Sequence, residues 1–140
     1  MSWCSWWFNF SVPDQFENAI AAFNRGDYFD AAELFEQSAA VSDAELKDLV
    51  IALNRISAAM HMRFERGTRQ GAINLLSQAL LTLDDIKPEH AGIDTGRLYD
   101  EVYAMTEEIR AAPRDDRAPF KHRARIFLER RRAPKIKRAR

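Results

Sequence analysis

The residues that could carry acid–base or metal chemistry are few in this chain. His61, His90 and His122 are its three histidines, and Cys4 is its one cysteine. His61 and Glu65 lie four residues apart, a spacing that places two metal-ligand types on one face of a helix. Two candidate ligands without a third are a weak signal. We therefore favour the simpler interpretation of this pair as ordinary helix residues.

Other catalytic signatures are missing from the sequence. It contains no Gly-rich phosphate loop, no G-x-S-x-G motif and no H-E-x-x-H motif. Cys4 has no neighbouring base and fits the role of a small hydrophobic residue. We predict no catalytic residue, no cofactor and no metal, and hence a protein that is not an enzyme. The least favoured alternative is a residual metal-dependent enzyme, built on four residues: His61, Glu65, Glu33 and Glu36.

The overall composition is typical of a soluble globular domain. The chain has 140 residues, of which 46% are hydrophobic and 30% charged, enough for one packed core. No apolar run approaches the roughly 20 residues that span a bilayer, and no basic region precedes an apolar stretch at the N-terminus. A single cysteine excludes a disulfide framework and favours a reducing compartment. We expect a cytoplasmic protein. Peripheral association with a membrane or a large complex is an open alternative.

The formal net charge of zero conceals a strong asymmetry. Residues 114–140 hold 12 of the Lys and Arg residues and only 3 acids, whereas the preceding residues hold 9 bases and 18 acids. The chain therefore joins an acidic body to a basic tail. Charge runs of this kind are usually solvated, and otherwise they contact a partner.

The elements that must position these residues are helices. Apolar residues recur at helical spacing in four patterns between Phe16 and Leu83, with turns near Gly26, Ser42 and Gly67. Further patterns predict a fifth helix after Asp94 and a sixth helix over about 120–132. We predict an all-α, compact antiparallel bundle of two helical hairpins plus a fifth helix, tetratricopeptide-like, with a basic C-terminal extension. The predicted divisions are an aromatic N-terminal segment, a bundle domain and the extension, at 1–12, 13–112 and 113–140.

Three stretches resemble the domain-of-unknown-function 309 family. FNRGDYFDAAELFE resembles its opening motif, RGTRQGAINLLSQAL its second motif, and KPEHAGIDTGRLYDEV the start of the last helix in cyanobacterial and plastid members. The likeness covers about 16–109. It implies an all-helical bundle and adds the plastid stroma as a second expected location.

The departures from the family motifs concern its histidines. The family places a His where this chain has Ala32, and another where it has Arg63, with His61 two positions early. The resemblance thus implies a degenerate member that has lost the family's site. Because two carboxylates facing a helix groove need a cation, we predict a structural ion pair of Arg63 with Glu33 or Glu36.

The two ends of the chain are the predicted partner contacts. The N-terminal segment concentrates large aromatic residues, which either cover a groove of the body, bind a protein or lie at a membrane interface. Missing basic residues nearby argue against the membrane. The predicted contacts in this segment are Trp3, Trp6, Trp7, Phe8 and Phe10.

The basic tail interleaves apolar residues with its charges. Nucleic acid, an anionic membrane surface and an acidic protein are its candidate partners. The interleaving favours a segment that docks and folds. The predicted contacts are Phe120, Lys121, Arg123, Arg125, Phe127, Arg130, Arg131, Arg132, Lys135, Lys137 and Arg138. We expect an adaptor, assembly factor or minor subunit of a larger complex, the alternative being an RNA- or DNA-associated protein.

Overall fold

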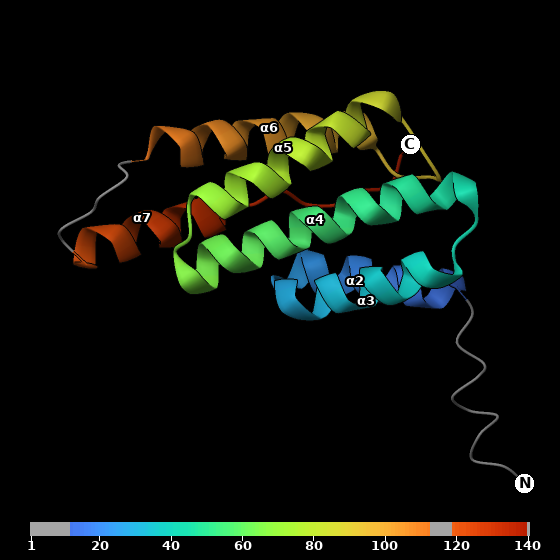
Figure 1. The fold of residues 1–140 in the computed structure, drawn as a ribbon, viewed down its shortest axis with the longest axis horizontal. Helices are drawn as coiled ribbons and strands as arrows, with labels where there is room; N and C mark the ends of the chain where they lie inside the picture. The colour runs from blue at the N-terminus through green and yellow to red at the C-terminus, as the bar shows by residue number, and fades with distance from the viewer. Residues whose placement is uncertain (1–11, 113–118, 140) are drawn as a thin grey trace, which may run out of the picture.

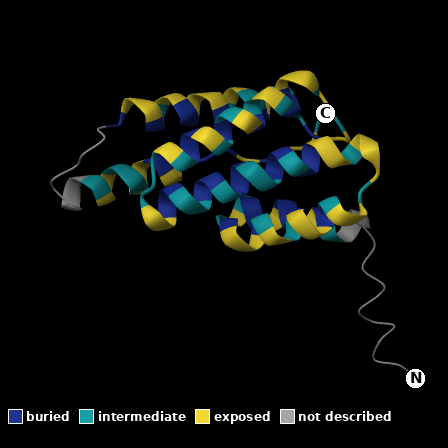
Figure 2. Ribbon diagram, viewed as in Figure 1, coloured by how far each residue is buried: buried dark blue, intermediate teal, exposed yellow. Residues whose placement is uncertain are grey.

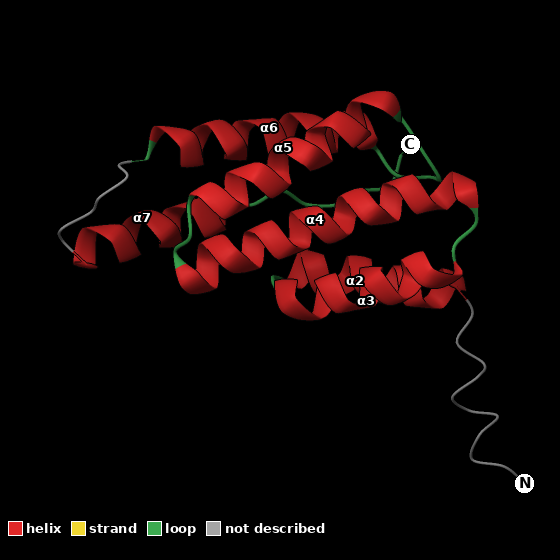
Figure 3. Ribbon diagram, in the orientation of Figure 1, coloured by secondary structure: helices red, strands yellow, loops and turns green. Residues whose placement is uncertain are grey.

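The computed structural model describes residues 12–112 and 119–139, and these form a bundle of helices (Figure 1). The helices are α2 (Val12–Arg25), α3 (Tyr28–Val41), α4 (Ala44–Arg66), α5 (Gln70–Asp85), α6 (Thr95–Ala111) and α7 (Pro119–Arg131). Figure 3 shows no strand among the described residues, which confirms the predicted all-α class. None of the helices in 12–112 and 119–139 is both long and apolar enough to cross a membrane.

Consecutive helices pack against each other as antiparallel neighbours. α2 packs on α3, α3 on α4, α4 on α5 and α5 on α6, so each short turn produces one contact between helices. The long helix α4 lies at the centre of Figure 1, with the α2–α3 pair on one side and the α5–α6 pair on the other. The predicted compact bundle of hairpins with an added helix is therefore confirmed.

The core follows the apolar stripes that the sequence predicted. Helices α2 to α6 each turn a buried apolar stripe inward, as the dark blue ribbon segments of Figure 2 show. Aromatic rings tie the first three helices together: Phe23 lies edge-on to Tyr28 at 5.3 Å, and Tyr28 lies 5.6 Å from Phe64. The fully buried residues of these stripes include Phe35, Leu49, Leu53, Ile56, Met60, Leu76, Leu83, Leu98, Val102 and Ile109.

Glycines end α2 and α4 because their backbone must turn left-handed. Gly26 has φ +91° and Gly67 has φ +68°. At Gly67 the turn is closed by two hydrogen bonds, from its own N–H to the Arg63 carbonyl at 3.0 Å and from Thr68 N–H to the Met62 carbonyl at 3.1 Å. These turns fold α3 back on α2 and α5 back on α4.

The tail does not extend from the bundle as a separate arm. α7 packs on α4, and residues 132–139 (the C-terminal strap) run back along the bundle to the loop before α6 (Figure 1). In the strap, Ala133 and Ile136 are 9% and 3% exposed and belong to the hydrophobic core. The prediction of an extension separate from the bundle is wrong for residues 119–139. The buried Ile136 and charge complementary to the acidic body dock residues 132–139 on the bundle.

Candidate functional site

A buried ion pair between α4 and α7 fixes the position of the tail. Arg63 Nε donates to Glu129 Oε2 at 2.7 Å, and its Nη2 donates to Oε1 at 2.8 Å. A third, longer contact joins Arg63 Nη1 to the Gly67 carbonyl at 3.4 Å. The two side chains are only 2% and 1% exposed. The planar guanidinium thus meets the carboxylate in the bidentate geometry that favours buried Arg pairs.

The predicted partners of Arg63 are wrong. Glu33 and Glu36 are exposed, because α3 turns its buried stripe, from Tyr28 to Ser38, away from them. Arg63 does form the structural ion pair that the sequence predicted for it, but Glu129 provides the carboxylate. Glu129 is the only acid from Arg117 to the end of the chain, and this isolation among bases was the available signal.

The buried Arg63–Glu129 pair fixes α7 in one position on α4. Both side chains are buried from solvent, so loss of one partner leaves an uncompensated buried charge at a cost of about 3–5 kcal/mol. α7 is therefore held against α4 independently of the exposed residues that surround it. Any surface that α7 presents has a defined orientation relative to the bundle.

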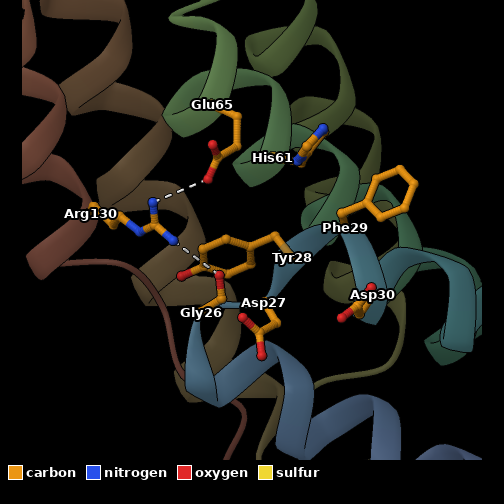
Figure 4. A pocket seen from close by; sticks show the side chains of 8 residues that line it. All are labelled: Gly26, Asp27, Tyr28, Phe29, Asp30, His61, Glu65 and Arg130. Carbon is orange, nitrogen blue, oxygen red and sulfur yellow. Dashed lines mark hydrogen bonds and ion pairs between the residues drawn. The ribbon is translucent and has the colours of Figure 1, made fainter.

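A small cleft lies between the α2–α3 turn, α4 and α7 (Figure 4). Its volume is about 180 Å³. Arg130 reaches across its mouth, donating to Glu65 Oε1 and to the Gly26 carbonyl, both at 3.2 Å. The Phe29 and His61 rings lie 5.3 Å apart beside it. The lining residues are Gly26, Asp27, Tyr28, Phe29, Asp30, His61, Glu65 and Arg130.

This cleft contains two of the four residues on which the metal-dependent enzyme alternative was built. His61 and Glu65 both line it, as their spacing on one helix requires, but Glu33 and Glu36 do not. Glu65 is already paired with Arg130. Within the described part of the chain, no three His, Cys, Asp or Glu side chains are grouped so that they could hold a metal ion. Burial raises the pKa of the Tyr28 phenol, an effect that the Arg130 charge opposes, so this phenol is protonated at neutral pH.

A second hollow, the α4–α7 groove, adjoins this cleft and shares Glu65 and Arg130 with it. Its volume is about 400 Å³. Phe64, Ile126 and Phe127 give it an apolar lining, and arginines surround them. The remaining lining residues are Glu65, Arg66, Gly67, His122, Arg123 and Arg130.

Beside this groove α7 presents an exposed patch, the α7 outer face, formed by Arg123, Phe127, Leu128 and Arg131. The side chains of Phe127 and Leu128 are 60% and 49% exposed. The Arg131 guanidinium lies 5.8 Å from the centre of the Phe127 ring, within reach of a cation–π contact. Two adjacent large apolar side chains among arginines make a surface that is both apolar and cationic.

Several other predicted partner contacts bind the protein's own body instead. Arg130 pairs with Glu65, Arg132 with Glu108 at 3.1 Å, and Arg138 with Glu17. Lys135 Nζ donates to the Asn24 carbonyl at 2.7 Å. These four cations thus contact the body of the protein itself, while the side chains of Arg130, Arg132 and Arg138 stay 44%, 67% and 48% exposed.

Some predicted contacts lie outside the described residues. These are the N-terminal aromatics at positions 3, 6, 7, 8 and 10, and the side chains at positions 120 and 121. Lys137 is exposed and accepts a hydrogen bond from Asp94 N–H through its carbonyl. Arg125 is half-buried.

Comparisons with known proteins add one distant relative. An uncharacterized protein of Aquifex aeolicus (strain VF5) is 34% identical over 100 residues, which are 69% of this chain and 30% of that protein. This chain thus spans less than a third of the relative's length. No family model matches the sequence, and no solved structure matches it.

Proposed function

We propose that this protein is a non-enzymatic binding module, an adaptor, assembly factor or minor subunit of a larger complex, which holds an acidic protein partner on the α7 outer face. The observation that carries the proposal is the exposure of Phe127 and Leu128 between Arg123 and Arg131. Exposed apolar groups on an otherwise polar helix mark interaction sites, and Phe and Arg are enriched in them.

The chemistry of this face specifies the kind of partner. Arg123 and Arg131 favour carboxylates, while Phe127 and the apolar lining of the α4–α7 groove accept an apolar side chain. The partner is accordingly an acidic segment that carries at least one large apolar residue. Rigid placement of α7 by the Arg63–Glu129 pair supports this, since less ordering entropy is lost on binding. The aromatic N-terminal segment remains proposed as a second contact.

Binding of RNA or DNA is the alternative, and it has less support. Arg130, Arg132 and Arg138 are engaged by carboxylates of the body, which lowers the charge available to phosphates. A nucleic-acid complex would weaken steeply as salt rises and would tolerate loss of the apolar side chains. A protein complex through the α7 outer face would depend on both kinds of residue.

Membership of the domain-of-unknown-function 309 family is also a proposal. It is supported by the turns of the three resembling stretches, where Gly26, Gly67 and Gly92 all have positive φ. With it comes the proposed setting, the cytoplasm or the plastid stroma of a cyanobacterial or plastid-like source. The Arg63–Glu129 pair then replaces the family's histidine site with a structural contact.

The experiment is a quantitative pull-down from source-cell extract with tagged full-length protein. Arg123→Glu with Arg131→Glu reverses the charge of the α7 outer face, and Arg97→Glu with Arg110→Glu applies the same charge change to exposed residues of α6. We expect the first variant to lose the captured acidic protein at least tenfold and the control to retain it, with equal thermal stability.

The same comparison is repeated with the apolar pair. Phe127→Ser with Leu128→Ser should also lose the partner, because the apolar part of the contact is removed. Both side chains are exposed and contribute little to folding, so this variant should stay folded. If both variants of the α7 outer face capture the same proteins as the α6 control, this face is not the binding site. Loss of RNA alone, restored at low salt, would instead favour the nucleic-acid alternative.

A further inference from the structure

The C-terminal strap is bound much as an extended peptide is bound in a groove. The Asn24 side-chain amide makes two hydrogen bonds to the backbone of Ile136. Its Nδ2 donates to the Ile136 carbonyl at 2.9 Å, and its Oδ1 accepts from the Ile136 N–H at 2.8 Å. A side-chain amide placed this way satisfies both backbone groups of one residue, as a neighbouring strand would. It therefore recognises an extended backbone rather than a particular side chain.

Other contacts along the strap are also directed at its backbone. Lys135 N–H donates to Glu101 Oε2 at 3.2 Å, at the wall formed by α6. Further along, the Lys137 carbonyl accepts from Asp94 N–H at 2.9 Å. Near the end, Ala139 N–H donates to the Gly92 carbonyl at 3.0 Å. The strap thus lies between α2 and the start of α6, in what we call the strap groove.

Few side chains of the strap determine its fit. Ile136 is the one large apolar anchor, at 3% exposure, next to the smaller buried Ala133 and Pro134. Lys135 and Arg138, on either side of the anchor, contact the Asn24 carbonyl and Glu17. The groove consequently selects a basic segment with a single aliphatic residue between its cations, which meet a backbone carbonyl and the Glu17 carboxylate.

The strap can leave without taking α7 with it. α7 has its own anchor, the Arg63–Glu129 pair, whose contacts do not involve the strap. Release of residues 132–139 would expose the groove while the rest of the bundle stays assembled. The strap's occupancy then depends on its tether, which supplies an effective concentration on the order of millimolar.

We propose that the strap groove is a recognition site for an extended basic segment of a partner protein, with one aliphatic anchor between cations, and that the strap is its resident, displaceable ligand. This partner is opposite in charge to the one assigned to the α7 outer face, and the two surfaces lie on different elements. The strap holds the site closed until a segment binds tightly enough to overcome the tethered competitor.

The probe is a fluorescent peptide of residues 132–139, titrated into full-length protein and followed by anisotropy. The wild-type chain should bind it weakly, because its own strap competes. Ile136→Asp in the full-length chain removes the anchor of the resident strap, and we expect peptide affinity to rise at least tenfold. Lys135→Glu with Arg138→Glu is a second opening variant that leaves the apolar core unchanged, in case the aspartate prevents folding.

Two controls test the specificity of the groove. Adding Asn24→Ala to either opened variant should lower peptide affinity at least tenfold, since the backbone clamp is lost. A peptide with aspartate in place of its isoleucine should not bind. The proposal is overturned if neither opened variant gains affinity, if Asn24→Ala has no effect, or if wild-type protein forms dimers at assay concentrations by exchanging straps, which would make a second copy the occupant.

Discussion

Removing the carboxylate of Glu129 is the most informative perturbation of this fold. Glu129→Ala deletes two charge-assisted hydrogen bonds, of 2.7 and 2.8 Å, and leaves the Arg63 guanidinium buried with only the Gly67 carbonyl at 3.4 Å. An uncompensated charge at 2% exposure costs about 3–5 kcal/mol. That is a large fraction of the roughly 5–15 kcal/mol that stabilises a domain, and it corresponds to a fall in Tm of roughly 10–20 °C.

Urea unfolding followed by circular dichroism measures this loss, and a double-mutant cycle isolates its cause. Arg63→Met should cost a similar amount, because it leaves the carboxylate buried and unpaired. For the cycle the second single variant is Glu129→Leu, which also leaves Arg63 unpaired. Arg63→Met combined with Glu129→Leu should be far less destabilised than the sum of Arg63→Met and Glu129→Leu, since an apolar pair of similar volume needs no counter-ion. The strong non-additivity is the expected signature of the buried pair.

A matched control separates the effect of burying an ion pair from the effect of forming one. Glu65→Ala breaks the contact of Glu65 with Arg130, whose side chains are 54% and 44% exposed, and should cost no more than about 1 kcal/mol. Equal losses for Glu65→Ala and Glu129→Ala would refute the reasoning. So would a double variant whose loss equals the sum of its parts, because the two groups would then act independently.

Three further predictions concern single contacts. Asn24→Ala should speed amide hydrogen exchange at Ile136 by at least tenfold, because its N–H and carbonyl lose their partner; an unchanged rate would contradict the clamp. The raised pKa of Tyr28 means that the unfolded chain ionises first, so the free energy of unfolding should fall as pH rises above about 10; Tyr28→Phe should remove that part of the fall in urea titrations. Gly67→Ala should lower stability by about 1–2 kcal/mol in thermal melts, since φ is +68° and the new Cβ would lie 2.7 Å from Nε2 of His122; an unchanged Tm would count against this strain.

Local patterns carried most of the fold. Apolar residues at helical spacing predicted the helices, and in α6 Leu98, Val102 and Ile109 are buried on one face as that spacing requires. Asp94 was predicted to begin a helix, and its side chain accepts from Arg97 N–H at 3.0 Å at the start of α6. These features depend on residues within one or two turns of each other.

The candidate sites depended on contacts between distant residues, and there the sequence was less informative. Arg63 was identified as an ion-pair residue from a motif position, but its partner lies 66 residues away along the chain. The spacing of His61 and Glu65 placed them in one cleft. No pattern in the neighbouring sequence indicated that Arg130 would form an ion pair with Glu65. Periodicity cannot report which face of one helix meets which residue of another.

The sequence by itself determined the helices, their order, their buried stripes and the opposite charges of body and tail, because each follows from residue type and short-range spacing. Only the tertiary structure decided how that charge is used. It turned Glu129 toward Arg63, seated Ile136 between α2 and α6, and left Phe127 and Leu128 exposed. The physical reason is that a tethered basic segment meets its own acidic body at high effective concentration, and the closest complementary surface binds it.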